Sequence, residues 1–144
     1  MDYIEGVKVA DLKIIHNQKG DIFHALKKSE KSFVTFGEAY FSNINRGEIK
    51  GWKKHTEMNL NLIVPVGLIR IYLIDCRENS TTCGVKNVFE IGLKNYKRIT
   101  IPPNIWFAFE GLDNQVNLLL NIASIEHSPT ESINKELNEF DLFT

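Results

Sequence analysis

Long apolar runs and an excess of charge are both missing from this chain of 144 residues. No apolar run approaches the roughly 18 residues that a membrane-spanning helix needs, so we expect no membrane partner. The start of the sequence also lacks a basic stretch followed by an apolar one, which is the pattern of a secretory signal. The formal net charge of −1 gives no electrostatic reason to expect nucleic acid as a partner.

Cysteine is scarce as well, and its spacing is not that of a redox or zinc motif. Cys76 and Cys83 lie seven positions apart and do not form a C-x-x-C pair. Two thiols in a chain without a secretory signal are expected to stay reduced. We therefore expect a cytoplasmic protein, and the length predicts one domain over residues 1–144.

Short apolar segments recur at intervals of about ten residues, separated by Gly, Asn and Pro, which is typical of an all-β sandwich or barrel. The expected strands lie at residues 7–15, 21–26, 33–42, 48–52, 59–65, 68–75, 86–91, 97–101 and 116–122, with an aromatic run at 105–109 after a Pro-Pro corner. Nine or ten strands of this kind indicate an antiparallel jelly-roll or cupin barrel.

The spacing of apolar residues changes after residue 129 from that of a strand to that of a helix. Ile133 and Leu137 lie four positions apart, and Ser128 or Thr130 can cap a helix that begins here. This spacing predicts one short C-terminal helix over residues 130–137.

Several motifs carry a resemblance to a known family. Residues 47–53 match the motif G-V-L-R-G-L-H, residues 75–82 match D-x-R-x-x-S-x-T, and residues 101–109 match I-P-x-G-F-A-H-G-F. Weaker matches lie at residues 17–20 and 38–42. Five such fragments in this order and spacing resemble the cupin-type dTDP-4-dehydrorhamnose 3,5-epimerase family, in its divergent branch. The resemblance implies a homodimer that takes a nucleotide-linked 4-keto-6-deoxy sugar in surface polysaccharide synthesis, without a cofactor.

Epimerisation beside a ketone needs a base, an acid on the opposite face, and a cation or donor for the enolate oxygen. In the family these are a His, a Tyr and a Lys, and the corresponding positions here hold Lys53, Asn121 and Asn61. We therefore expect a degenerate catalytic set. Alternation along a strand places Lys53 and His55 on one face, so either is a candidate base, and Tyr40 is a candidate proton donor. The structural alternatives are a solvated Lys53 and a His55 at the rim of the pocket.

Binding of a nucleotide sugar needs cations and aromatic faces. A diphosphate carries about two charges and is matched by two or three cations. Aromatic faces suit sugars and bases, although tryptophans also pack in cores. The expected substrate-binding residues are Lys19, Arg46, Lys50, Trp52, Asn61, Arg77, Trp106 and Asn121.

A metal is not expected. A metal-binding cupin presents His-x-His, then a Glu and a distant His, because a divalent ion needs three or four converging ligands. Lys53 occupies the first His position, Glu57 lies too close to His55, and Phe107 occupies the distant position.

Three functions stay open at this point. The first is an epimerase-like protein that acts on or binds a nucleotide-linked 4-keto-6-deoxy sugar. The second is a non-catalytic cupin that keeps the sugar-nucleotide pocket. The third is a ketoisomerase on the same class of substrate.

Overall fold

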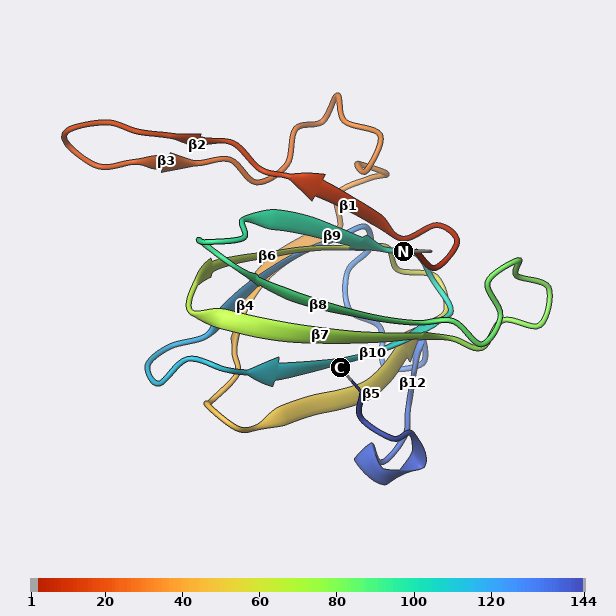
Figure 1. The fold of residues 1–144 in the computed structure, drawn as a ribbon. Coiled ribbons are helices and arrows are strands. Elements are labelled where there is room, and N and C mark those ends of the chain that lie inside the picture. Colours follow the sequence, from red (N-terminus) through yellow and green to blue (C-terminus); the bar gives the residue numbers. More distant parts are fainter. Residues whose placement is uncertain (1–2, 144) are drawn as a thin grey trace.

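Twelve strands and one short 3-10 helix make up the computed structural model, which describes residues 3–143 (Figure 1). The strands are β1 (Lys8–Asp11), β2 (Ile14–Ile15), β3 (Ile22–Phe23), β4 (Glu38–Asn43), β5 (Ile49–His55), β6 (Leu60–Val66), β7 (Leu68–Asp75), β8 (Lys86–Gly92), β9 (Lys97–Ile101), β10 (Ile105–Gly111), β11 (Leu118–Ala123) and β12 (Ser132–Asn134). The 3-10 helix η1 is Leu137–Glu139. Within the described part of the chain, no helix has the length and apolar character that crossing a membrane requires.

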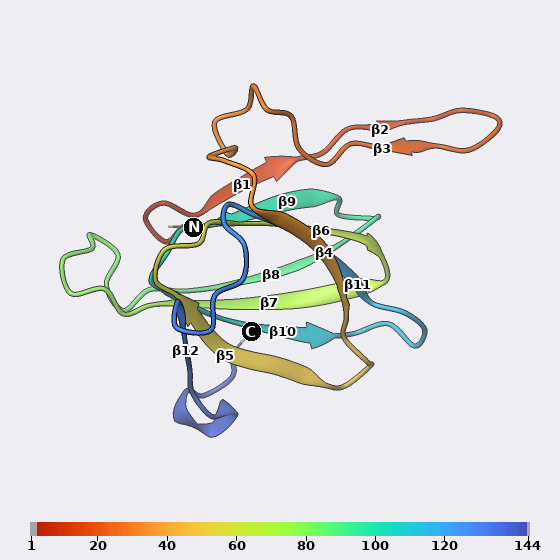
Figure 2. The same cartoon turned by 180° about the vertical axis from the view of Figure 1, so that it is seen from behind.

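The strands form two five-stranded sheets that face each other (Figure 2). The first sheet has the order β1-β9-β6-β11-β4 and the second has the order β12-β5-β10-β7-β8. All pairings between the named strands are antiparallel. Strands β2 and β3 form a separate hairpin that projects from the body (Figure 1). The expected all-β, antiparallel, cupin-like architecture is thereby confirmed.

The core lies between the two sheets. Strand alternation turns one face of each sheet inward, and both sheets contribute fully buried aliphatic side chains. Representative members are Leu62 and Ile99 of the first sheet and Ile71 and Leu73 of the second. One end of this interior remains hollow, and it is described below.

A second apolar cluster covers the outer face of the second sheet. Trp52, Tyr72 and Trp106 are buried there, and Phe140 and Phe143 from the C-terminal segment pack on them. The Trp52 indole N–H donates to the Leu137 carbonyl at 3.3 Å. The C-terminal segment is therefore held by aromatic contacts.

The prediction of a helix over residues 130–137 is wrong. Residues 132–134 form β12, which pairs with β5 and is the edge strand of the second sheet. Reciprocal backbone hydrogen bonds between Trp52 and Lys135, of 3.1 and 2.9 Å, continue this pairing. Without β12, β5 would be an edge strand with unpaired backbone groups, and satisfying these groups outweighs the weak local preference implied by the four-residue spacing. Only η1, at residues 137–139, is helical in this region.

Candidate functional site

A cavity of about 310 Å³ opens between the two sheets. Strands β4, β6 and β11 supply one wall, and β5, β10 and β12 supply the other. The lining residues are Tyr40, Ser42, Lys50, Gly51, Lys53, His55, Leu60, Phe107, Phe109, Leu119, Asn121 and Asn134. Apolar walls with a few convergent polar groups are typical of a small-molecule site.

A bulge in the β5–β10 pairing brings two cations into this cavity. Lys50 pairs with Phe109 and Lys53 pairs with Phe107, so two residues of β5 lie opposite a single residue of β10. Simple alternation would turn Lys50 and Lys53 to opposite faces of the sheet, because they are three positions apart. The extra residue of the bulge resets the alternation, and both side chains line the cavity.

Glycine at position 51 allows the two strands to approach closely at the bulge. A Cβ on Gly51 would lie 2.5 Å from the Cβ of Ala108, well inside contact distance. Gly51 also has a φ of 156°, near the limit of the region that favours glycine.

His55 forms the most tightly held polar contact of the cavity wall. Its Nδ1 lies 2.6 Å from Glu131 Oε1, and both side chains are buried. The other carboxylate oxygen accepts the backbone N–H groups of Glu57 at 3.0 Å and Met58 at 2.9 Å. The His55 ring also stacks on Phe107, with 5.6 Å between centroids. Position and orientation of the imidazole are therefore fixed from two sides.

The charge of Glu131 sets the tautomer of His55. Burial alone would raise the pKa of Glu131, but hydrogen bonds from the Glu57 amide, the His55 ring and the Met58 amide hold this pKa below its ordinary value. A carboxylate accepts hydrogen bonds only, so Nδ1 of His55 carries the proton. In the neutral imidazole this arrangement makes the opposite ring nitrogen, Nε2, the acceptor that a general base requires.

Two turns hold the backbone around His55. The Asn104 N–H donates to the His55 carbonyl at 2.7 Å, and Asn104 has a φ of 67°, which asparagine tolerates better than most residues. The Thr56 N–H and hydroxyl both donate to the Glu131 carbonyl, at 2.9 and 2.7 Å. The Pro-Pro-Asn corner seen in the sequence therefore supports the histidine.

Tyr40 and Asn121 face His55 from the other sheet. They are direct partners in the β4–β11 pairing, and Asn121 Nδ2 donates to the Tyr40 hydroxyl at 2.9 Å. Ser42 lies two positions along β4, and its hydroxyl accepts a hydrogen bond from Lys50 Nζ at 2.9 Å. The expected residues Tyr40, Lys50, Lys53, His55 and Asn121 thus line one cavity.

Trp52, Trp106 and Asn61 do not line the cavity. Both tryptophans belong to the outer apolar cluster, because the alternation of β5 and β10 turns them away from the interior. Asn61 is buried in the first sheet, where it donates to the Ser32 carbonyl at 3.0 Å and accepts from the Thr100 hydroxyl at 2.6 Å. These three positions are occupied by packing and internal hydrogen bonds.

Three expected diphosphate partners also lie elsewhere. Lys19 is exposed between β2 and β3, in the hairpin that projects from the body (Figure 1). Arg46 is exposed and contacts Asn114 through a side-chain hydrogen bond. Arg77 forms an ion pair with Asp75 at 2.9 Å and donates to the Glu5 carbonyl at 2.7 Å. Cavity-facing cations are therefore supplied by β5.

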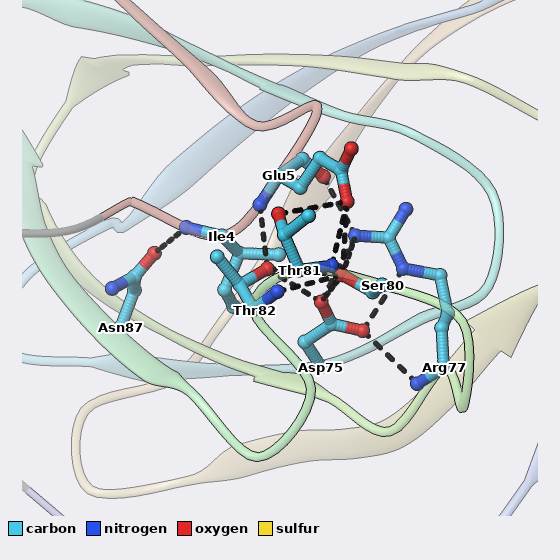
Figure 3. A network of polar contacts seen from close by, with 8 residues as sticks. All are labelled: Ile4, Glu5, Asp75, Arg77, Ser80, Thr81, Thr82 and Asn87. Carbon is cyan, nitrogen blue, oxygen red and sulfur yellow. Dashed lines mark hydrogen bonds and ion pairs between the residues drawn. The ribbon is translucent and has the colours of Figure 1, made fainter.

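The Asp75–Arg77 pair belongs to a network that fixes the loop after β7 (Figure 3). The fully buried Asp75 carboxylate accepts hydrogen bonds from Arg77, from the Ser80 hydroxyl at 2.6 Å and from the Thr82 hydroxyl at 2.7 Å. Burial alone would raise the pKa of Asp75, but these three partners hold it far below its ordinary value.

This network predicts a specific loss of stability in acid. A carboxyl whose pKa is lowered by folding stabilises the protein above its unfolded pKa of about 3.9, and this contribution fades as pH falls. We expect the free energy of unfolding to drop below about pH 4 and Asp75→Asn to flatten that part of the profile. Urea unfolding between pH 7 and 2.5 measures this free energy, and Asp113→Asn, which changes an exposed carboxylate, is the control. Equal slopes for both variants would contradict the assignment.

Residue Glu131 is an important member of the site that sequence reasoning missed. It lies 76 positions from His55, in a segment whose spacing predicts a helix. No local motif marks it, since its role depends on β12 pairing with β5. Among residues 3–143, no group of three or more His, Cys, Asp and Glu side chains is arranged to hold a metal ion.

The chain is similar in sequence and structure to several known proteins. No family model matches the chain. A solved dTDP sugar isomerase from Desulfovibrio desulfuricans is 34% identical, with a TM-score of 0.89 over 92% of this chain and 85% of that one. A probable low-salt glycan biosynthesis epimerase of Haloferax volcanii is 29% identical, over 84% of this chain and 79% of that protein.

Two further proteins similar to this chain are a polysaccharide biosynthesis protein and a sugar epimerase. The spore coat polysaccharide biosynthesis protein SpsL of Bacillus subtilis is 25% identical, over 93% of this chain and 89% of that protein. The dTDP-4-dehydrorhamnose 3,5-epimerase of Sulfolobus tokodaii shares the fold, with a TM-score of 0.86 and 18% identity over 99% of this chain and 84% of that one. The extent of the match to the Desulfovibrio protein shows that this chain belongs to the family of dTDP-sugar isomerases that resemble dTDP-4-dehydrorhamnose 3,5-epimerases.

Proposed function

We propose that this protein removes the proton beside the ketone of a nucleotide-linked 4-keto-6-deoxy sugar, as an epimerase or isomerase of glycan or polysaccharide biosynthesis. The observation that carries the proposal is the buried pair of His55 and Glu131, of which His55 lines a sugar-sized cavity. The names of the Haloferax and Bacillus relatives support the pathway class.

The base is His55. Its Nε2 takes the acidic proton, the electron pair of the C–H bond forms a C=C bond, the π electrons of the carbonyl move onto its oxygen, and an enolate forms. The Glu131 carboxylate stabilises the resulting imidazolium through Nδ1–H, at the 2.6 Å contact. Lys50 and Lys53, on the same strand, supply positive charge for the enolate oxygen or for the diphosphate.

Tyr40 is the proton donor of the epimerase reaction. It lies on the sheet opposite His55, so a proton from its hydroxyl reaches the face of the ring that His55 does not contact. Return of a proton on that face inverts the carbon. This role replaces that of the family tyrosine, whose position here holds Asn121.

A ketoisomerase is the second candidate, favoured by the 34% identity to a protein named an isomerase. In that reaction one base suffices: His55 removes the proton at C3, the enediolate forms, the proton returns to C4, and the hydrogen of the C3 hydroxyl passes to the C4 oxygen. The ketone then lies at C3 instead of C4.

Incubation with dTDP-4-keto-6-deoxyglucose in D₂O tests both reactions. Proton and carbon NMR of an epimerase reaction should show deuterium at an inverted carbon, whereas a ketoisomerase reaction should move the carbonyl signal. Binding without deuterium uptake or carbonyl movement would overturn the proposal and indicate a non-catalytic sugar-nucleotide-binding protein.

The two cavity lysines should determine affinity for the nucleotide sugar. Charge-assisted hydrogen bonds contribute about 1.5–3 kcal/mol, so Lys50→Ala and Lys53→Ala should each weaken dTDP-glucose binding by about tenfold or more. Lys54→Ala is the matched control, since Lys54 Nζ lies 5.0 Å from the centroid of the outward-facing Trp106. Titration calorimetry measures the three affinities. If Lys54→Ala lost as much affinity for dTDP-glucose as the other two variants, the cavity would not be the binding site.

The proposed architecture and assembly are a jelly-roll homodimer. The two sheets are the halves of a single jelly-roll domain. Two copies form the homodimer through exposed apolar surface at and beside the edge strand β4, where Phe36 and Phe41 lie. A cytoplasmic location agrees with the unbridged cysteines Cys76 and Cys83.

A further inference from the structure

The amide of Asn121 is only half satisfied. Its side chain is 4% exposed and lines the cavity, and Nδ2 donates to the Tyr40 hydroxyl. Its Oδ1 is buried and has no hydrogen-bond partner among residues 3–143. The only other buried side-chain atom without a partner in the described chain is Arg98 Nε, which lies in the interaction of β9 with residues 25–32.

A buried carbonyl oxygen without a donor is costly, and native proteins rarely leave one. Asn121 lies beside the proposed proton donor Tyr40, and this position explains why its Oδ1 has no donor within the described part of the chain. A ligand that supplied a donor at this point would recover the lost hydrogen bond only when bound. Because Asn121 lines the cavity, a donor for its oxygen can come from a ligand bound there.

We propose that Asn121 determines sugar specificity by accepting, through Oδ1, a hydrogen bond from a free hydroxyl of the sugar ring. This inference rests on the proposed function. A ketone oxygen or an ionised diphosphate presents acceptors only and cannot pair with Oδ1. A ring hydroxyl can, and the ring must lie near Tyr40 and His55 if those residues exchange its protons.

The same amide also positions Tyr40. Donation from Nδ2 to the Tyr40 oxygen leaves the phenolic hydrogen free to point at the sugar. Recognition of the hydroxyl and placement of the acid thus depend on one side chain. A sugar that lacks the hydroxyl leaves Oδ1 unpaired, and we expect it to bind roughly ten- to a hundredfold more weakly.

Calorimetric binding of unreactive nucleotide sugars tests this inference. The probes are dTDP-glucose and its 2-deoxy and 3-deoxy analogues, and the proteins are the wild type, Asn121→Leu and Tyr40→Phe. In the wild type, one analogue should bind at least tenfold more weakly than dTDP-glucose. That penalty should shrink to about twofold in Asn121→Leu and persist in Tyr40→Phe, which keeps the Oδ1 acceptor.

Two results would overturn the inference while leaving the proposed function standing. One is equal affinity of the wild type for all three probes, and the other is an unchanged penalty in Asn121→Leu. If dTDP-glucose does not bind the wild type at all, the proposed function and this inference both fail. Should Asn121→Leu not fold, Asn121→Ala provides the same comparison with a smaller side chain.

Discussion

His55→Asn should lower the rate of solvent deuterium incorporation into a dTDP-linked 4-keto sugar by about a thousandfold. A positioned general base contributes roughly 10²–10⁴ to a rate, and asparagine cannot take a proton from carbon. Asparagine keeps a polar group beside Glu131, so the affinity for dTDP-glucose should change little. The exchange rate is measured by NMR and the affinity by calorimetry, on the same preparations.

The hairpin supplies a matched control for this variant. His16 Nδ1 also contacts a carboxylate, Asp21, at 3.1 Å, but its side chain is 84% exposed and does not line the cavity. His16→Asn should leave the exchange rate unaltered. If His55→Asn retains exchange and Lys53→Ala abolishes it, the base is Lys53 and the role assigned to His55 is wrong.

Glu131→Gln should reduce activity by up to about a thousandfold, the loss expected for His55→Asn, because replacing the carboxylate of a triad by its amide leaves the base in the wrong tautomer. The Glu57 and Met58 N–H groups require an acceptor, so the amide oxygen of the introduced glutamine must face them. Its NH₂ group then faces His55 and donates to Nδ1. The proton of the imidazole moves to Nε2, which can no longer accept one.

The tautomer of His55 separates this positioning role from a merely structural one. Nitrogen NMR of the imidazole should show Nδ1–H in the wild type and Nε2–H in Glu131→Gln, with a preserved affinity for dTDP-glucose. A matched control is Glu136→Gln, which alters an exposed carboxylate outside the cavity. Loss of activity without a change of tautomer would show that Glu131 acts through the fold alone.

Sequence pattern predicts part of the site for a simple reason. Alternation within one strand fixes the relative direction of side chains, so the expectation that Lys53 and His55 share one face is correct. The bulge that adds Lys50 to that face depends on how β5 pairs with β10, which no local pattern contains. Trp52 and Trp106 could not be distinguished from ligand-stacking residues, because the segment that buries them lies beyond residue 136.

The C-terminal region shows the limit of local reasoning most clearly. The spacing of Ile133 and Leu137 fits a helix, but the backbone of residues 132–134 completes the edge of the second sheet instead. This pairing delivers Glu131 to His55, so the wrong element prediction also conceals the partner of the base. Arg77, predicted to bind phosphate, is held by Asp75, two positions away in the chain.

A crystal structure with dTDP-glucose bound tests the central claim most directly. We expect the glucose ring inside the cavity, with a ring carbon facing His55 Nε2, a hydroxyl within about 3.2 Å of Asn121 Oδ1, and the diphosphate near Lys50 and Lys53. Electron density for the nucleotide sugar on another face of the molecule, with an unoccupied space between Tyr40 and His55, would contradict the account.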